Sequence, residues 1–136
     1  MKLLMIYATT FGYETSVKAL DSELDRSERR FLDNVLVGFI HAEPQDEAQA
    51  ASVETHLVKY LKWAARKNET NRILLHSFAH LAERKASPEF TKQLLQNAEQ
   101  RLAAAGYEAF QTPFGFFLNL HLEAPGHSLA RIFKSL

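Results

Sequence analysis

One histidine stands where an enzyme of the α/β class would place a reactive group. Residues 73–75 form a short apolar run typical of a buried strand, and the run His-Ser-Phe-Ala-His of residues 76–80 follows it. In α/β domains, ligands bind beyond the carboxyl ends of strands, where the chain turns toward the next helix. His80 is therefore a candidate for chemistry near neutral pH, and a surface histidine with no task is the alternative.

The composition excludes several kinds of chemistry. The 136 residues include no cysteine, so disulfides, thiolate catalysis and cysteine-type zinc sites are absent, and no metal or other cofactor is expected. The lack of cysteine fits a cytoplasmic protein. Sixteen Lys and Arg balance sixteen Asp and Glu. This balance argues against a general nucleic-acid coat protein, but it is compatible with one RNA end held in a pocket.

The length and the patterning indicate one domain over residues 1–136, with no membrane association. The apolar run at residues 3–7 is too short for a signal peptide or a membrane span. No repeat or Pro/Gly-rich linker interrupts the chain. A start at Met1 and an apolar C-terminal segment favour a free-standing or cleanly excised domain.

Hydrophobic periodicity predicts the elements that must position His80. Ser87 is a good N-cap, Pro88 suits the first helical position, and Gly106 suits the position after the helix. The segments Thr9–Glu14 and Ser22–Arg30 are expected as a loop and as solvated surface. Strands are expected at 3–8, 35–40, 73–75, 107–112 and 116–123, and helices at 46–68, 88–105 and 127–136.

This order predicts a single α/β domain in which a mixed β-sheet packs against helices. In the last long strand, Phe116, Leu118, Leu120 and Leu122 alternate with polar residues, so one face is expected to pack on helices. The cations of the first helix are either complements of its dipole or contacts to an RNA backbone.

Several stretches resemble the archaeal-type editing domain of threonyl-tRNA synthetase. Residues 77–81, Ser-Phe-Ala-His-Leu, resemble the family's Pro-Tyr-Ala-His-Leu motif. Residues 113–117, Pro-Phe-Gly-Phe-Phe, resemble its Pro-Phe-Gly-Trp-Tyr-Lys signature. The other matching stretches are 3–8 with 13–14, 35–43, 87–89 and 124–130.

The resemblance implies a D-aminoacyl-tRNA deacylase-like fold and hydrolysis of serine wrongly attached to threonine tRNA. The implied partners are the 3′ end of an aminoacyl-tRNA and threonyl-tRNA synthetase, in the cytoplasm. A homodimer is also implied, with Val37, Phe39 or Phe114 at its interface. His80 is the implied catalytic residue. The implied substrate-binding positions are Ala42, Ser77, Ala79, Phe117, Leu118 and Arg131.

At these positions the chain departs from the family pattern. The family's Tyr-Lys pair falls on Phe117 and Leu118, which removes a hydroxyl donor and a cation. A family glutamate falls on Arg131, which is a candidate for restoring a positive charge from the other side of the pocket. Asn119 or His121 is a candidate for placing water. The alternative for each of the three is a solvent-facing residue with no role in the site.

Three functions therefore remain open. The first is an aminoacyl-tRNA deacylase with altered catalytic residues, which His80 favours. The second is a catalytically degenerate module of the same fold that binds a tRNA end, a protein or a small ligand, which the missing lysine and tyrosine favour. The third, an unrelated hydrolase using His80 and His121, lacks a serine or cysteine elbow motif.

Overall fold

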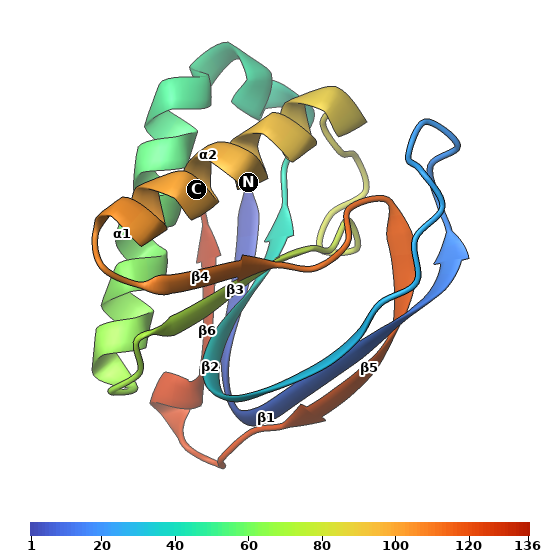
Figure 1. The fold of residues 1–136 in the computed structure, drawn as a ribbon. Helices are drawn as coiled ribbons and strands as arrows, with labels where there is room; N and C mark the ends of the chain where they lie inside the picture. The colour runs from blue at the N-terminus through green and yellow to red at the C-terminus, as the bar shows by residue number, and fades with distance from the viewer.

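The computed structural model describes all of residues 1–136 as one α/β unit (Figure 1). Two α-helices lie on one face of a six-stranded sheet, and the two chain ends lie close together. In chain order the elements are β1 (Lys2–Lys18), β2 (Arg29–His41), η1 (Pro44–Gln49), α1 (Ala50–Lys67), β3 (Arg72–Ser77), α2 (Pro88–Ala104), β4 (Glu108–Gln111), β5 (Phe116–Glu123), η2 (Ser128–Ala130) and β6 (Arg131–Ser135).

The sheet is mixed, as the sequence predicts. Its strand order is β4-β3-β2-β1-β5; β6 also pairs with β1. Strands β2, β3 and β4 are parallel, and β1 is antiparallel to β2, β5 and β6. Because parallel strands need crossover connections, α1 and α2 lie between β2, β3 and β4 in the chain. The carboxyl ends of β2 and β3 therefore reach the same edge of the sheet.

The helices form where their apolar spacing and capping residues predict. The Oγ atom of Ser87 accepts a hydrogen bond from the backbone N–H of Phe90 at 3.2 Å, and Pro88 occupies the first turn of α2. Gly106 follows the helix with φ of +93°, a conformation that glycine adopts without steric cost. Both helices bury one stripe against the sheet. Its fully or nearly fully buried members are Val53, Leu57, Leu61, Ala64, Leu94, Leu95, Ala98 and Leu102.

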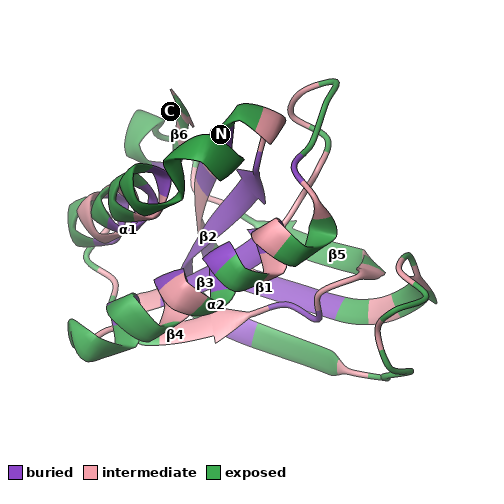
Figure 2. Ribbon diagram, turned by 90° about the horizontal axis from the view of Figure 1, so that it is seen from above, coloured by how far each residue is buried: buried purple, intermediate pink, exposed green.

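The packing of α1 on the sheet is tight around Gly38 of β2. A Cβ atom at Gly38 would lie 2.8 Å from Cδ2 of Leu61, so a glycine is needed for α1 to approach this closely. Gly38 faces α1; its neighbours Val37 and Phe39 must point to the opposite face. Both are buried there, in a second and smaller cluster with Leu74. Figure 2 shows buried residues concentrated along the central strands.

This burial corrects the expectation for a dimer interface. Val37 and Phe39 are 0% and 5% exposed within one chain, so neither is free to contact a second copy. Phe114 is half-buried, in the segment that precedes β5. The exposed apolar side chains lie elsewhere, and on β5 they include Phe117, Leu120 and Leu122.

Two elements differ from the sequence prediction. The segment Thr9–Glu14 is not a loop but the middle of β1, paired with both β2 and β5. The C-terminal segment is not a helix from residue 127: it is the short turn η2 followed by β6, paired antiparallel with Lys2–Ile6. In both cases pairing with a distant strand overrides the local pattern.

Strand β5 also differs from its predicted packing. Its apolar positions alternate as expected, but Leu120 and Leu122 are 43% and 41% exposed and do not pack beneath a helix. On the other side of the molecule, the amino group of Lys134 from β6 lies 5.3 Å from the ring centre of Tyr60 and 5.9 Å from that of Trp63. These contacts join β6 to α1. No helix is long and apolar enough to span a membrane.

Candidate functional site

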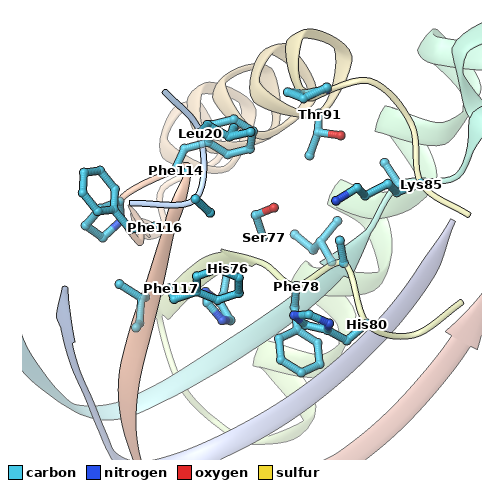
Figure 3. A pocket seen from close by; sticks show the side chains of 18 of the residues that line it. Leu20, His76, Ser77, Phe78, His80, Lys85, Thr91, Phe114, Phe116 and Phe117 are labelled. Carbon is cyan, nitrogen blue, oxygen red and sulfur yellow. The ribbon is translucent and has the colours of Figure 1, made fainter. Parts of the chain in front are cut away.

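A pocket of about 340 Å³ opens beyond the carboxyl ends of β2 and β3. Ile40 near the end of β2 and Ala42 directly after it contribute to its base. Two segments far apart in the sequence form its walls. The first runs from His76 to Thr91, and the second from Pro113 to Leu120, joined by Ala19 and Leu20. Figure 3 shows the side chains of both walls converging on this space.

The first wall is built on residues 78–86, which we call the histidine loop, and His41 of β2 anchors it. His41 is 1% exposed. Its Nδ1 atom accepts a hydrogen bond from the backbone N–H of Leu81 at 3.0 Å, which leaves Nε2–H to donate to the carbonyl oxygen of Arg84 at 2.7 Å. One imidazole therefore holds two points of the loop.

Backbone hydrogen bonds complete this anchoring at both ends of the histidine loop. The N–H of Phe78 donates to the carbonyl oxygen of Ile40 at 2.9 Å, and the N–H of Ala86 donates to that of Ala42 at 2.9 Å. The loop has no regular secondary structure of its own. The position of the histidine loop thus depends on the end of β2, the strand that also supports the pocket.

His80 lies at the exposed turn of the histidine loop and lines the pocket. Its ring centre is 4.9 Å from that of Phe78, with the planes 72° apart. No carboxylate or other protein group is hydrogen-bonded to the His80 ring. The imidazole is therefore accessible to a ligand or a water molecule rather than engaged in a protein pair.

His76, four residues earlier, has a different environment. It is buried, and its Nδ1 atom is 2.9 Å from the hydroxyl oxygen of Thr112. Burial, with a smaller contribution from the nearby His80, lowers the pKa of His76 from 6.5 to about 4. At neutral pH His76 is uncharged. It links β3 to the chain just before the second wall.

The second wall is apolar. Phe114, Phe116, Phe117 and Leu118 all line the pocket, and the side chain of Phe117 is 55% exposed. Gly115 shapes this wall: its φ is +85°, and its carbonyl oxygen accepts hydrogen bonds from the N–H groups of residues 19 and 20. We call residues 113–118 the aromatic wall.

The charge in the pocket comes from one residue that the sequence analysis did not single out. Lys85 is the one Lys or Arg among the lining residues, which include no Asp or Glu. Its amino group points into the pocket (Figure 3). The signal in the sequence was a cation five residues after His80, but nothing in the sequence indicated its direction.

Most of the positions implied by the resemblance come together here. His80 and the five residues Ala42, Ser77, Ala79, Phe117 and Leu118 line this same pocket. Arg131 does not: it begins β6, pairs with Ile6, and donates a hydrogen bond to the carbonyl oxygen of Pro125 at 2.8 Å. The expectation that Arg131 brings charge to the pocket is therefore corrected. A strand, rather than the expected helix, places it on the outer side of β1.

Two further candidates also lie outside the pocket. Asn119 and His121 are exposed on β5, opposite Glu14 and Gly12 of β1. The His121 ring is 5.9 Å from that of Phe31 and does not line the pocket. No group of three or more His, Asp or Glu side chains has an arrangement that could hold a metal ion.

Comparison with solved structures identifies the class of fold. The chain is similar to the c-Myc DNA Unwinding Element Binding Protein, with a TM-score of 0.72, 12% identity and coverage of 100% of this chain and 99% of that one. At this identity the likeness concerns the fold alone. It confirms the single-domain α/β class with a mixed sheet.

Sequence comparison then identifies the family. A model of the archaea-specific editing domain of threonyl-tRNA synthetase matches residues 1–136, so the chain belongs to this family. The threonine–tRNA ligases of Thermococcus gammatolerans and Thermococcus kodakarensis are each 32% identical to it over its whole length, and that of Methanocaldococcus jannaschii is 26% identical. The chain spans 22% of the length of these relatives.

Proposed function

We propose that this pocket hydrolyses the ester between an amino acid and the 3′ end of tRNA. The proposed substrate is threonine tRNA that wrongly carries serine. The observation that carries the proposal is the convergence of His80 with five other family positions in one pocket. The ester of a small amino acid would lie between the histidine loop and the aromatic wall. No metal or cofactor takes part in this scheme.

The small side chains near the base favour a small acyl group. Ala42 and Ala79 contribute only methyl groups, and Ser77 adds a hydroxyl, so a seryl group with its own hydroxyl can be accommodated. Steric exclusion of one additional methyl group is worth about 1–3 kcal/mol, or roughly 10–200-fold in rate. We therefore expect seryl esters to be preferred over threonyl esters by a factor in this range.

The two walls suit the two parts of the substrate. The backbone N–H groups of Ala79 and His80 donate to no protein acceptor, so they can donate to the ester or to water. His80, free of protein partners, can place the attacking water. The exposed ring of Phe117 can stack on the terminal adenine, an interaction worth about 1–3 kcal/mol per base.

A second candidate function is binding without hydrolysis. It is favoured by one observation: Phe117 and Leu118 occupy the positions of the family's tyrosine and lysine, and both line the pocket. Losing one donor to a developing oxyanion typically lowers the rate about 10²–10³-fold. A pocket that had lost its donors would keep the tRNA end and leave the ester intact.

The test is deacylation of seryl-, threonyl- and D-aminoacyl-tRNA by the purified protein. We expect seryl-tRNA to be hydrolysed fastest, and His80→Ala to lower kcat about 10²–10⁴-fold, the usual contribution of a positioned proton-transfer group. His121→Ala is the matched control, because His121 is an exposed histidine outside the pocket. Tight tRNA binding with no hydrolysis of any ester would favour the second function instead.

We further propose that the domain acts in the cytoplasm, in association with threonyl-tRNA synthetase and as a homodimer. The family membership supports the association. The exposed leucines of β5, Leu120 and Leu122, support a contact between copies. Sedimentation of the purified protein measures this directly, and a monomeric mass at all concentrations would remove the dimer.

A further inference from the structure

The positive charge of Lys85 lies in the pocket without a carboxylate partner in the protein. None of the ion pairs in the molecule includes it. No Asp or Glu lines the pocket to neutralise its charge. Its side chain nevertheless points inward rather than away from the molecule (Figure 3).

The backbone on both sides of Lys85 is fixed. The carbonyl oxygen of Arg84 accepts the hydrogen bond from His41, and the N–H of Ala86 donates to Ala42. His41 is the last residue of β2 and Ala42 follows it directly, and this segment also contributes to the base of the pocket. The starting point of the Lys85 side chain is therefore as well defined as the pocket itself, although the residue lies in a loop.

We propose that Lys85 is a catalytic residue that stabilises the negative charge that develops on the carbonyl oxygen of the ester. This inference rests on the proposed deacylation. It assigns to the histidine loop the positive charge that the resemblance would have placed at Leu118 of the aromatic wall. A bound tRNA end would cover the pocket mouth and exclude water, so that the charge of Lys85 would act more strongly than in open solvent.

The role follows the charge through the reaction. Water adds to the carbonyl carbon of the ester and gives up a proton to His80, and the carbonyl oxygen becomes negative beside the Lys85 ammonium group. The carbonyl bond then re-forms, the bond to the ribose oxygen breaks, and that oxygen takes the proton from His80. The products are the free amino acid and tRNA. Lys85 acts on the charged intermediate more than on the neutral ester, so it should raise kcat rather than lower KM.

The chain lends itself to a direct test of this charge, because it contains no cysteine. Lys85→Cys introduces a single thiol. Alkylation with bromoethylamine adds an amino group at nearly the length of lysine, whereas iodoacetamide adds a neutral amide. We expect Lys85→Cys to lower kcat on seryl-tRNA about 10²–10³-fold with little change in KM. Aminoethylation should restore most of the rate, and the neutral reagent should not.

Arg84→Gln is the matched control: it removes a neighbouring positive charge whose side chain does not line the pocket. We expect it to keep the activity of the unchanged protein. A Lys85→Cys variant that hydrolyses at the unaltered rate, loses only affinity, or recovers equally with either reagent would overturn the role of Lys85 while leaving the proposed function intact. An unaltered protein with no activity on any ester would overturn both.

Discussion

The two walls of the pocket differ in chemistry and in how they are held. The histidine loop carries His80 and Lys85, has no regular secondary structure, and is anchored to β2 by side-chain and backbone hydrogen bonds. The aromatic wall carries phenylalanines and Leu118, and it continues directly into β5. The polar groups of the pocket are thus concentrated on the wall that needs the most anchoring.

This difference indicates how the chain combines reactivity with order. A loop allows polar side chains to be exposed to a ligand, because its backbone is not committed to a sheet. Precision then has to come from a buried group such as His41. The aromatic wall needs no such anchor, since strand pairing with β1 positions it. Three changes separate these contributions.

The largest effect should come from His41→Ala, which breaks the anchoring of the histidine loop. It removes the partners of the Leu81 N–H and the Arg84 carbonyl. Each partly buried polar group left unpaired costs about 1–3 kcal/mol. We expect the free energy of unfolding to fall by roughly 2–4 kcal/mol, measured by urea denaturation. We also expect kcat on seryl-tRNA to fall, by a larger factor than any change in KM.

A conservative variant separates positioning from general stability. His41→Gln keeps one acceptor and one donor, so it should recover part of kcat and restore slow exchange of the Leu81 amide hydrogen. His56→Ala is the control, because His56 is exposed on α1, where its ring is hydrogen-bonded only within the helix, to the carbonyl oxygen of Ser52. Equal loss of kcat in the Gln and Ala variants would argue against a positioning role for His41.

A somewhat smaller effect should appear with pH, through His76 between the two walls. The folded-state pKa of about 4 lies below the ordinary value of 6.5, so the unfolded chain binds the proton first as pH falls. The contribution of His76 to the free energy of unfolding is therefore fully present above pH 6.5 and is lost as the pH falls toward 4. A pKa lowered from 6.5 to about 4 corresponds to a contribution of roughly 3 kcal/mol at most to the free energy of unfolding.

Urea denaturation at pH 7 and pH 4.5 measures this loss. His76→Gln keeps a partner for the Thr112 hydroxyl but cannot titrate, so its unfolding free energy should change much less over the same interval. If the variant and the original protein lost stability in parallel, other groups would have to account for the pH dependence.

The smallest effect should come from the aromatic wall, through Gly115→Ala. The positive φ of Gly115 costs a non-glycine residue about 1–2 kcal/mol, and the added Cβ would lie 2.7 Å from Cγ of Glu23. We expect a loss of roughly 1–2 kcal/mol in unfolding free energy. Gly126→Ala is the control, because a Cβ there meets nothing within 4 Å. Equal stability of the two variants would show that the wall tolerates the strain.

Much of the fold could be predicted because its signals are local. The start of α2 at Ser87 and Pro88, the turn at Gly106, and the apolar stripes of both helices depend on residues within a few positions of each other. The extent of β1 and the strand β6 could not. Residues 131–135 have an apolar spacing compatible with a helix, and only pairing with residues 2–6, at the other end of the chain, makes them a strand.

The site shows the same limit. His80 and the small residues around it could be predicted, because they lie beside the ends of strands that the sequence marks clearly. Lys85 and Arg131 could not be assigned, since the direction of a side chain depends on the tertiary contacts of its segment. His41 anchors the loop that carries Lys85, and the pairing of β6 with β1 places Arg131 away from the pocket.

The single tryptophan of the chain, Trp63, gives this molecule a selective optical reporter. It lies on α1 beside Lys134 of β6 and does not line the pocket. A charged group near an indole alters its emission, so the fluorescence spectrum should follow the docking of the last strand against the helix. Ligands entering the pocket should leave the spectrum nearly unchanged, and a shift in emission would signal the separation of β6 from α1.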